Sequence, residues 1–186
     1  MAILVLQPDG TSGIDAYVDS ANPTTNFGTS TDLEWGQPTT NICRSYIKFD
    51  LSSIPPASTI TSATLELNRW AWTGGGVGEP YDRVYRVTSS WDEGTITWNV
   101  QPSWSTDTIM GAIPFVTAPG TATITLDTTQ FSLMIASNYG MMLRGREDAT
   151  GTGELANSSD DSVSSVRPKL TIDYIPAGGS QVVVIM

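Results

Sequence analysis

Histidine is absent from the 186 residues of this chain, and Cys43 is its single cysteine. The lack of histidine removes the commonest general base and the commonest metal ligand. One cysteine excludes an intrachain disulfide, a cysteine cluster for zinc and a CxxC redox pair. The chain is nevertheless long enough to bury a sizeable core without such staples.

Positive charge is also scarce. Nine lysines and arginines face 19 aspartates and glutamates, which gives a formal net charge of −10 at pH 7. Phosphate backbones and anionic lipid surfaces repel such a chain, so neither nucleic acid nor membrane is predicted as a partner. No apolar run approaches the length of a membrane span. Residues 1–8 lack a basic region and a cleavage site, which predicts synthesis in the cytoplasm without a signal peptide.

Short stretches in which apolar and polar residues alternate recur along the chain. Ile47, Phe49 and Leu51, for example, share one face of an expected strand. Proline and glycine separate these stretches at close intervals, which is typical of strands joined by turns. One helix is predicted at about 129–136, capped by a residue within 127–129. The pattern predicts an all-β fold, a jelly-roll β-sandwich with one short helix and apolar terminal arms.

The two ends of the chain differ from its middle. Residues 1–13 are expected to form an apolar arm or strand, residues 14–175 the sandwich domain, and residues 176–186 a linker with an uncharged apolar tail. An exposed tail of this kind would aggregate, so burial is expected. It can add a strand to its own sheet, add a strand to another subunit, or stay disordered. The expected assembly strand consists of Val182, Val183, Val184 and Ile185.

Several sequence blocks follow one another between Asp15 and Tyr174. They include DAYV from Asp15, NPTTNFG from Asn22, RSYIKFDLSSIP from Arg44, VYRVTSSWDE from Val84, TWN from Thr97 and RPKL from Arg167. In order and spacing these blocks resemble the DNRLRE-type domain, a bacterial and phage β-sandwich family related to carbohydrate-binding modules, although the hexapeptide that names the family is missing. The resemblance implies a non-catalytic jelly-roll domain that works at surfaces. Some relatives bind acidic polysaccharides through basic side chains, whereas the net charge here predicts repulsion of a polyanion.

Trp70 and Trp72 are the candidates for a binding surface. If Leu65 and Leu67 face inward, both tryptophans fall on the outward face and form a flat platform for a sugar ring or a protein partner. The alternatives are a bulge after Asn68 that turns one ring inward, and a strand buried on both faces.

Calcium is the single cofactor that the sequence suggests, since acidic loops supply the oxygen ligands it needs. The candidate ligands are Asp15 and Asp19 in one group and Asp160 and Asp161 in another. Neither group matches the spacing of an EF-hand, and aspartates also favour turns for local reasons. Glu93 is not among these candidates, because we expect it in a structural loop whose tryptophans pack over the sandwich.

Two functions of different classes follow. The first is a structural surface protein of a phage virion, a capsid decoration or fibre-associated subunit. It would assemble with copies of itself or with a capsid lattice through its sandwich and terminal strands. This hypothesis places it in a virion, or outside the cell after leaderless release. The alternative is a carbohydrate-binding or adhesion module that uses the tryptophan platform on surface glycans. No enzyme is predicted, because Asp92 and Glu93 are neighbours that point apart, and neither a nucleophile nor an oxyanion motif accompanies them.

Overall fold

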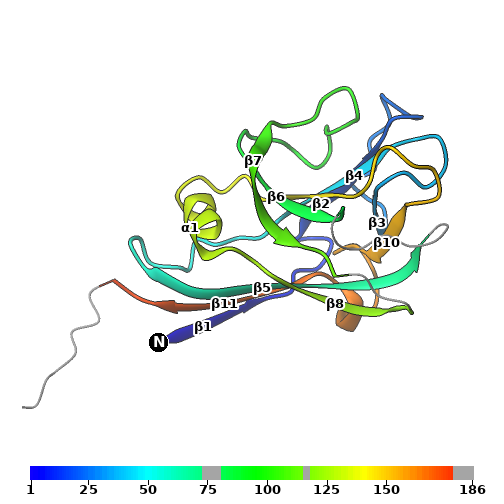
Figure 1. Cartoon of the computed structure of the whole chain (residues 1–186). Helices are drawn as coiled ribbons and strands as arrows, with labels where there is room; N and C mark the ends of the chain where they lie inside the picture. Colours follow the sequence, from blue (N-terminus) through cyan, green and yellow to red (C-terminus); the bar gives the residue numbers. More distant parts are fainter. Residues whose placement is uncertain (73–80, 115–117, 178–186) are drawn as a thin grey trace, which may run out of the picture.

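The computed structural model describes residues 1–72, 81–114 and 118–177. Within these residues the chain forms two antiparallel sheets that face each other, with one helix at the end of the sandwich (Figure 1). The predicted all-β jelly-roll sandwich with one short helix is confirmed. The elements are β1 (Ala2–Leu6), β2 (Ile14–Asp19), β3 (Asp32–Trp35), β4 (Cys43–Lys48), β5 (Thr59–Trp72), β6 (Arg83–Val87), β7 (Trp104–Ala112), β8 (Gly120–Thr125), α1 (Thr128–Ala136), β9 (Met141–Arg144), β10 (Glu154–Asn157), the 3-10 helix η1 (Ser164–Val166) and β11 (Lys169–Ile175).

The first sheet is built around the long strand β5. Its order is β1-β11-β5-β10-β3, and β8 also pairs with β5. The second sheet has the order β2-β4-β9-β6-β7. Among the strand pairs of the described residues, β6 and β7 follow each other directly in sequence, whereas the other pairs join more distant segments, so each sheet is completed only when the whole domain closes.

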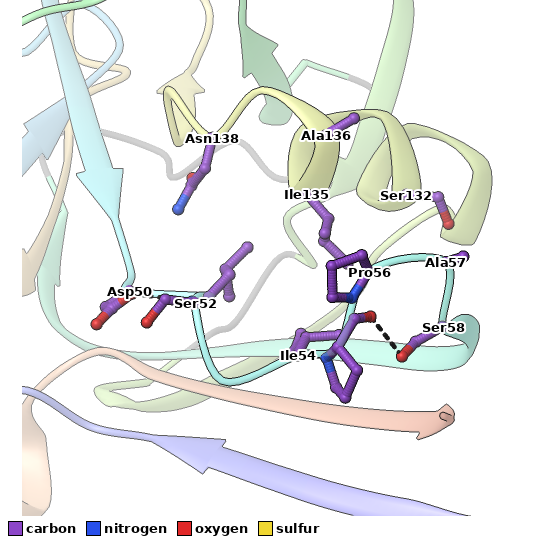
Figure 2. Close-up of a pocket in the computed structure, with 12 residues that line it drawn as sticks. Asp50, Ser52, Ile54, Pro56, Ala57, Ser58, Ser132, Ile135, Ala136 and Asn138 are labelled. Carbon is purple, nitrogen blue, oxygen red and sulfur yellow. Dashed lines mark hydrogen bonds between the residues drawn. The ribbon is translucent and has the colours of Figure 1, made fainter. Parts of the chain in front are cut away.

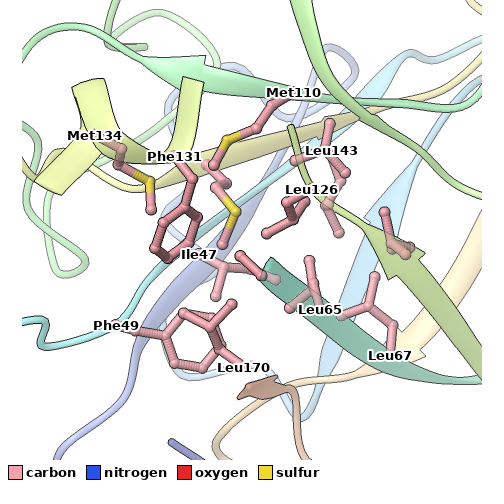
Figure 3. Close-up of a cluster of buried hydrophobic side chains, with 14 of the residues drawn as sticks. Ile47, Phe49, Leu65, Leu67, Met110, Leu126, Phe131, Met134, Leu143 and Leu170 are labelled. Atoms are coloured by element: carbon pink, nitrogen blue, oxygen red, sulfur yellow. The ribbon is translucent and has the colours of Figure 1, made fainter. Parts of the chain in front are cut away.

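The core lies between the two sheets. Ile47, Phe49 and Leu51 are 2%, 3% and 5% exposed, as the alternating pattern of this segment predicts. Ile47 and Phe49 meet Leu65 and Leu170 from the opposite sheet (Figure 3). Burial of each such side chain contributes about 1.5 to 3 kcal/mol, which makes this layer the main source of stability.

Helix α1 begins where the sequence predicts a cap. The Asp127 carboxylate accepts a hydrogen bond of 2.8 Å from the main-chain N–H of Gln130. Phe131 and Met134 point from the helix into the core (Figure 3). Neither helix in the described part of the chain combines the length and the apolar character that crossing a membrane requires.

Residues of the N-terminal arm form the edge strand β1, which pairs with β11 from Ala2 opposite Tyr174 to Leu6 opposite Leu170. Ile3 and Val5 lie on the outer face of this strand and are 68% and 55% exposed. The expected assembly strand of Val182, Val183, Val184 and Ile185 lies outside the described residues, so its pairing stays a prediction.

Candidate functional site

The outer face of the five-stranded sheet carries a second apolar cluster. Tyr46 on β4 points away from the core yet is fully buried, because residues 88–103, here called the tryptophan loop, fold over it. Trp91 anchors this loop by donating a hydrogen bond of 2.7 Å from Nε1 to the carbonyl oxygen of Tyr139. Trp98 and Tyr85 complete the cover. The tryptophans pack this loop over the sandwich, as the sequence predicts.

Three arginines form a row beside this cluster. Arg44 on β4 lies directly opposite Arg144 on β9, and Arg144 lies directly opposite Arg83 on β6. Residues that face each other across antiparallel strands share one side of the sheet, so the three side chains leave the same surface. Like charges in these positions destabilise a sheet, and the row therefore needs a counter-ion.

Glu147 supplies that counter-ion. Its carboxylate accepts two hydrogen bonds from Arg44, at 2.7 and 3.0 Å, and two from Arg144, at 2.9 and 2.7 Å. Burial acts to raise the pKa of Glu147, but the hydrogen bonds from Arg144 and Arg44 and their positive charges outweigh it and lower the pKa to about 2. Glu147 is thus ionised over the physiological range and fixes two guanidinium groups.

Aromatic and amide side chains also contact the guanidinium of Arg44. Its guanidinium lies 4.9 Å from the centre of the Trp98 ring and 5.0 Å from that of Trp104. Gln101 accepts a hydrogen bond from its Nη1 at 3.1 Å. Cation–π contacts and a bidentate carboxylate together leave Arg44 little freedom, so it serves to order the site.

The row opens into a shallow groove of about 390 Å³, here called the arginine groove. Tyr81 is 45% exposed, and the guanidinium of Arg146 lies 4.7 Å from the centre of its ring. Arg146 also donates to Asp148 at 2.7 Å. The groove therefore offers guanidinium groups beside the exposed aromatic ring of Tyr81. Its lining consists of Tyr81, Arg83, Tyr85, Arg144, Gly145, Arg146, Glu147 and Asp148.

Comparison with known families shows what this β-sandwich is. The model of carbohydrate-binding module family 96 matches residues 9–174. The chain belongs to carbohydrate-binding module family 96. The match spans most of the chain and assigns it to a family of non-catalytic binding modules. No curated protein matches the chain. The sequence resemblance to a β-sandwich related to carbohydrate-binding modules is thus confirmed at that level, while its assignment to the DNRLRE-type domain stays a prediction.

Trp70 and Trp72 do not sit as a pair on one face of this family 96 module. On β10, Leu155 pairs with Ala71 and Ala156 with Arg69, so Trp70 is an extra residue in a bulge. The bulge reverses the alternation, and Trp72 pairs opposite the buried Glu154. The geometry expected for a shared platform is therefore wrong, and the alternative of a bulge after Asn68 holds.

Trp70 by itself remains exposed on the six-stranded sheet. Its ring is 43% exposed, and its Nε1 donates to Asp32 at 3.0 Å. A single ring beside one carboxylate lacks the guanidinium groups that the arginine groove combines. A role for Trp70 or Trp72 in binding stays a prediction.

The four predicted calcium ligands do not form one group in the module. Asp15 and Asp160 come together, and they meet Glu93, which sequence reasoning placed in the structural loop. Asp19 instead accepts hydrogen bonds from Asn22 and Asn41 in a loop network. Asp161 accepts from the main-chain N–H of Val163 at 2.7 Å and from Asn157. Asp19 and Asp161 thus act as turn residues.

A larger pocket, of about 810 Å³, lies between α1 and residues 50–58 (Figure 2). Figure 2 shows Ile135 pointing from the helix toward Pro56. Its lining residues include no aromatic ring and one charged side chain, Asp50. Sugar rings are bound by aromatic faces and converging polar groups, so the smaller arginine groove is the better candidate for the binding site of this family 96 module.

Proposed function

We propose that this chain binds carbohydrate at the arginine groove and that its ligand is a carboxylated polysaccharide. The observation that carries the proposal is the juxtaposition of Arg144, Arg146 and the exposed ring of Tyr81 in one open groove. Guanidinium groups recognise carboxylates through two parallel hydrogen bonds, and a tyrosine ring packs against the apolar face of a sugar. An open groove suits a chain that extends past the site on both sides.

The net charge of −10 does not oppose this ligand, because the charge at the groove has the other sign. Three arginines and two acidic residues line the groove, and Arg44 extends the row. At an ionic strength of about 0.1 M, charges further than about 10 Å from a ligand are largely screened. The local excess of arginine therefore decides whether a carboxylate is attracted.

Binding at this groove is proposed as non-catalytic. The virion and assembly hypothesis depends on the tail 181–186, which lies outside the described residues, and the family match favours the carbohydrate alternative. We therefore infer a binding or adhesion role on glycans rather than on a capsid lattice.

Affinity electrophoresis and calorimetry with polygalacturonate and alginate test the proposal. Fully methyl-esterified pectin is the matched neutral probe, because it keeps the polygalacturonate backbone and lacks the carboxylate charge. Arg146→Gln and Tyr81→Ala are each expected to weaken binding about tenfold, as loss of one charge-assisted hydrogen bond or one stacking contact does. Binding is also expected to weaken as salt rises.

Two variants separate this site from the rest of the surface. Lys169→Gln removes one positive charge from the outer face of the other sheet, where Lys169 pairs with Glu66, and should leave binding unchanged. Trp70→Ala tests the residue singled out from the sequence. If Trp70→Ala abolishes binding while Arg146→Gln does not, the arginine groove is the wrong site. If the module prefers the esterified pectin, the carboxylated ligand is wrong.

A further inference from the structure

Three carboxylates from distant parts of the chain meet in one cluster. Asp15 lies on β2, Glu93 lies in the tryptophan loop, and Asp160 follows β10. One carboxylate oxygen from each residue lies within 4.8 Å of the others. Oxygen ligands lie about 2.4 Å from Ca²⁺, so a single ion can touch atoms that are up to twice this distance apart.

A second observation points to a ligand at this cluster. Asp15 is only 2% exposed, and its Oδ2 accepts a hydrogen bond of 2.9 Å from the main-chain N–H of Ser159. Its Oδ1 is buried and has no hydrogen-bond partner among the described residues. Buried polar atoms are almost always satisfied, so this carboxylate oxygen beside two further carboxylates calls for a partner.

The loop that precedes β2 closes over the cluster at contact distance. A Cβ atom on Gly10 would lie 2.2 Å from Asp160 Oδ1, and one on Gly13 would lie 2.1 Å from Ser159 Oγ. Glycine at these two positions lets the main chain pack directly against the side chains of Asp160 and Ser159.

The nearest cations do not neutralise the cluster. Lys48 lies over the ring of Trp91, 5.5 Å from its centre, and Arg167 donates to the carbonyl oxygen of Asp161 at 2.7 Å. Among the described residues, none of the three carboxylates forms a salt bridge. Burial raises the pKa of Asp15 to about 7 and also raises the pKa values of Glu93 and Asp160.

We propose that Asp15, Glu93 and Asp160 bind one Ca²⁺ ion, which fastens the tryptophan loop to β2 and to the segment after β10. Hard oxygen ligands on three separate segments suit calcium, which accepts irregular coordination by six to eight oxygens, better than magnesium, which demands a near-ideal octahedron. Since Trp98 in the same loop flanks Arg44, the ion supports the ordering of the arginine row. The ion site does not depend on the identity of the glycan.

Thermal unfolding of the full chain tests this site without any glycan. After removal of metal with EDTA, addition of about 1 mM CaCl₂ is expected to raise the Tm by about 5 °C or more, because an ion that binds only the folded state stabilises it. Isothermal titration calorimetry should give one Ca²⁺ per chain. Glu93→Gln and Asp160→Asn keep the shape of each side chain, and each is expected to lose most of the shift in Tm.

Asp92→Asn is the matched control, because Asp92 is the exposed neighbour of Glu93 and lies outside the cluster. It should keep the full Ca²⁺ response. The proposal is overturned if wild type shows no Ca²⁺ response, or if Glu93→Gln and Asp160→Asn respond as wild type does. An equal shift with MgCl₂ at the same concentration would overturn the assignment to calcium.

Discussion

Replacing Arg69 by methionine is expected to lower the free energy of unfolding by about 3 to 5 kcal/mol, because it removes one partner of a buried ion pair. Arg69 lies on β5 and is completely buried. It forms a salt bridge with Glu154 on β10, which is also completely buried, and donates to the carbonyl oxygen of Pro114 at 2.9 Å. Methionine fills a similar volume but leaves the carboxylate of Glu154 without this partner.

A second buried acid, Asp82, interacts with this pair. Burial and the neighbouring Glu154 raise the pKa of Asp82 to about 8, while the charges of Arg69 and Arg83 oppose this rise. Asp82 is therefore already largely protonated at pH 7 and changes little when Arg69 is lost. The loss falls on Glu154, which must take up a proton or be solvated without Arg69, and either change lowers stability at neutral pH.

Urea unfolding at pH 7 measures the loss in the free energy of unfolding. In thermal unfolding, the Tm should fall by roughly 10 °C. Arg146→Met is the control, since Arg146 pairs with Asp148 on the surface, where solvent screening leaves an ion pair little effect on stability. The double variant Arg69→Met, Glu154→Leu should recover much of the loss, because it removes both partners of the pair. If Arg69→Met lowers the free energy of unfolding by less than about 1 kcal/mol, the pair between Arg69 and Glu154 does not stabilise the fold as proposed.

The inward face of β4 could be read from the sequence, but the burial of Tyr46 could not. Alternation depends on the backbone of one strand and is therefore visible in a single segment. Tyr46 lies on the opposite, outward phase and is buried only because the tryptophan loop, which begins 42 residues after it, returns over the sheet. Contacts of this kind follow from the closure of the whole domain.

The candidate sites show the same division. Arg44 is out of phase with Ile47, which already places it on the outward face of its strand. Its alignment with Arg144 and Arg83 depends on the registers of three strands that are not neighbours in sequence. The acidic cluster likewise joins Asp15 to Glu93, which is 78 positions later in the sequence, and to Asp160, which is 145 positions later. The sequence suggests Asp15 and Asp160 as calcium ligands, but it does not show that Glu93 completes the group.

The bulge at Trp70 is a harder case. It arises because one residue is inserted where β10 pairs with β5, and a strand partner so distant in sequence leaves no local signal. A single inserted residue changes the face of every position that follows it. This is why the pattern that predicts Leu65 and Leu67 inward does not extend to Trp72.

Replacing Glu147 by glutamine is expected to lower the free energy of unfolding at pH 7 by about 2 kcal/mol. The carboxylate accepts four hydrogen bonds from two arginines, and a glutamine can offer only one oxygen while its NH₂ group faces guanidinium donors. The arginines that face each other across β4 and β9 then repel each other without a counter-ion. Arg144 is 37% exposed, so solvent screening keeps the loss below that of a fully buried pair.

The loss should disappear in acid. The pKa of Glu147 is about 2 in the folded protein, below the value of 4.5 for a free glutamate, so this group stabilises the fold fully above about pH 5. Protonation removes that contribution as the pH falls through 4.5 toward 2, and wild type then approaches the variant. Thermal unfolding of wild type and Glu147→Gln at pH 7, 4 and 2.5 should therefore show a difference in Tm that shrinks with acidity. Asp148→Asn, at the 77% exposed neighbour, should show almost no difference at any pH. A difference for Glu147→Gln that stays constant from pH 7 to 2.5 would mean that its charge does not hold the arginine row together.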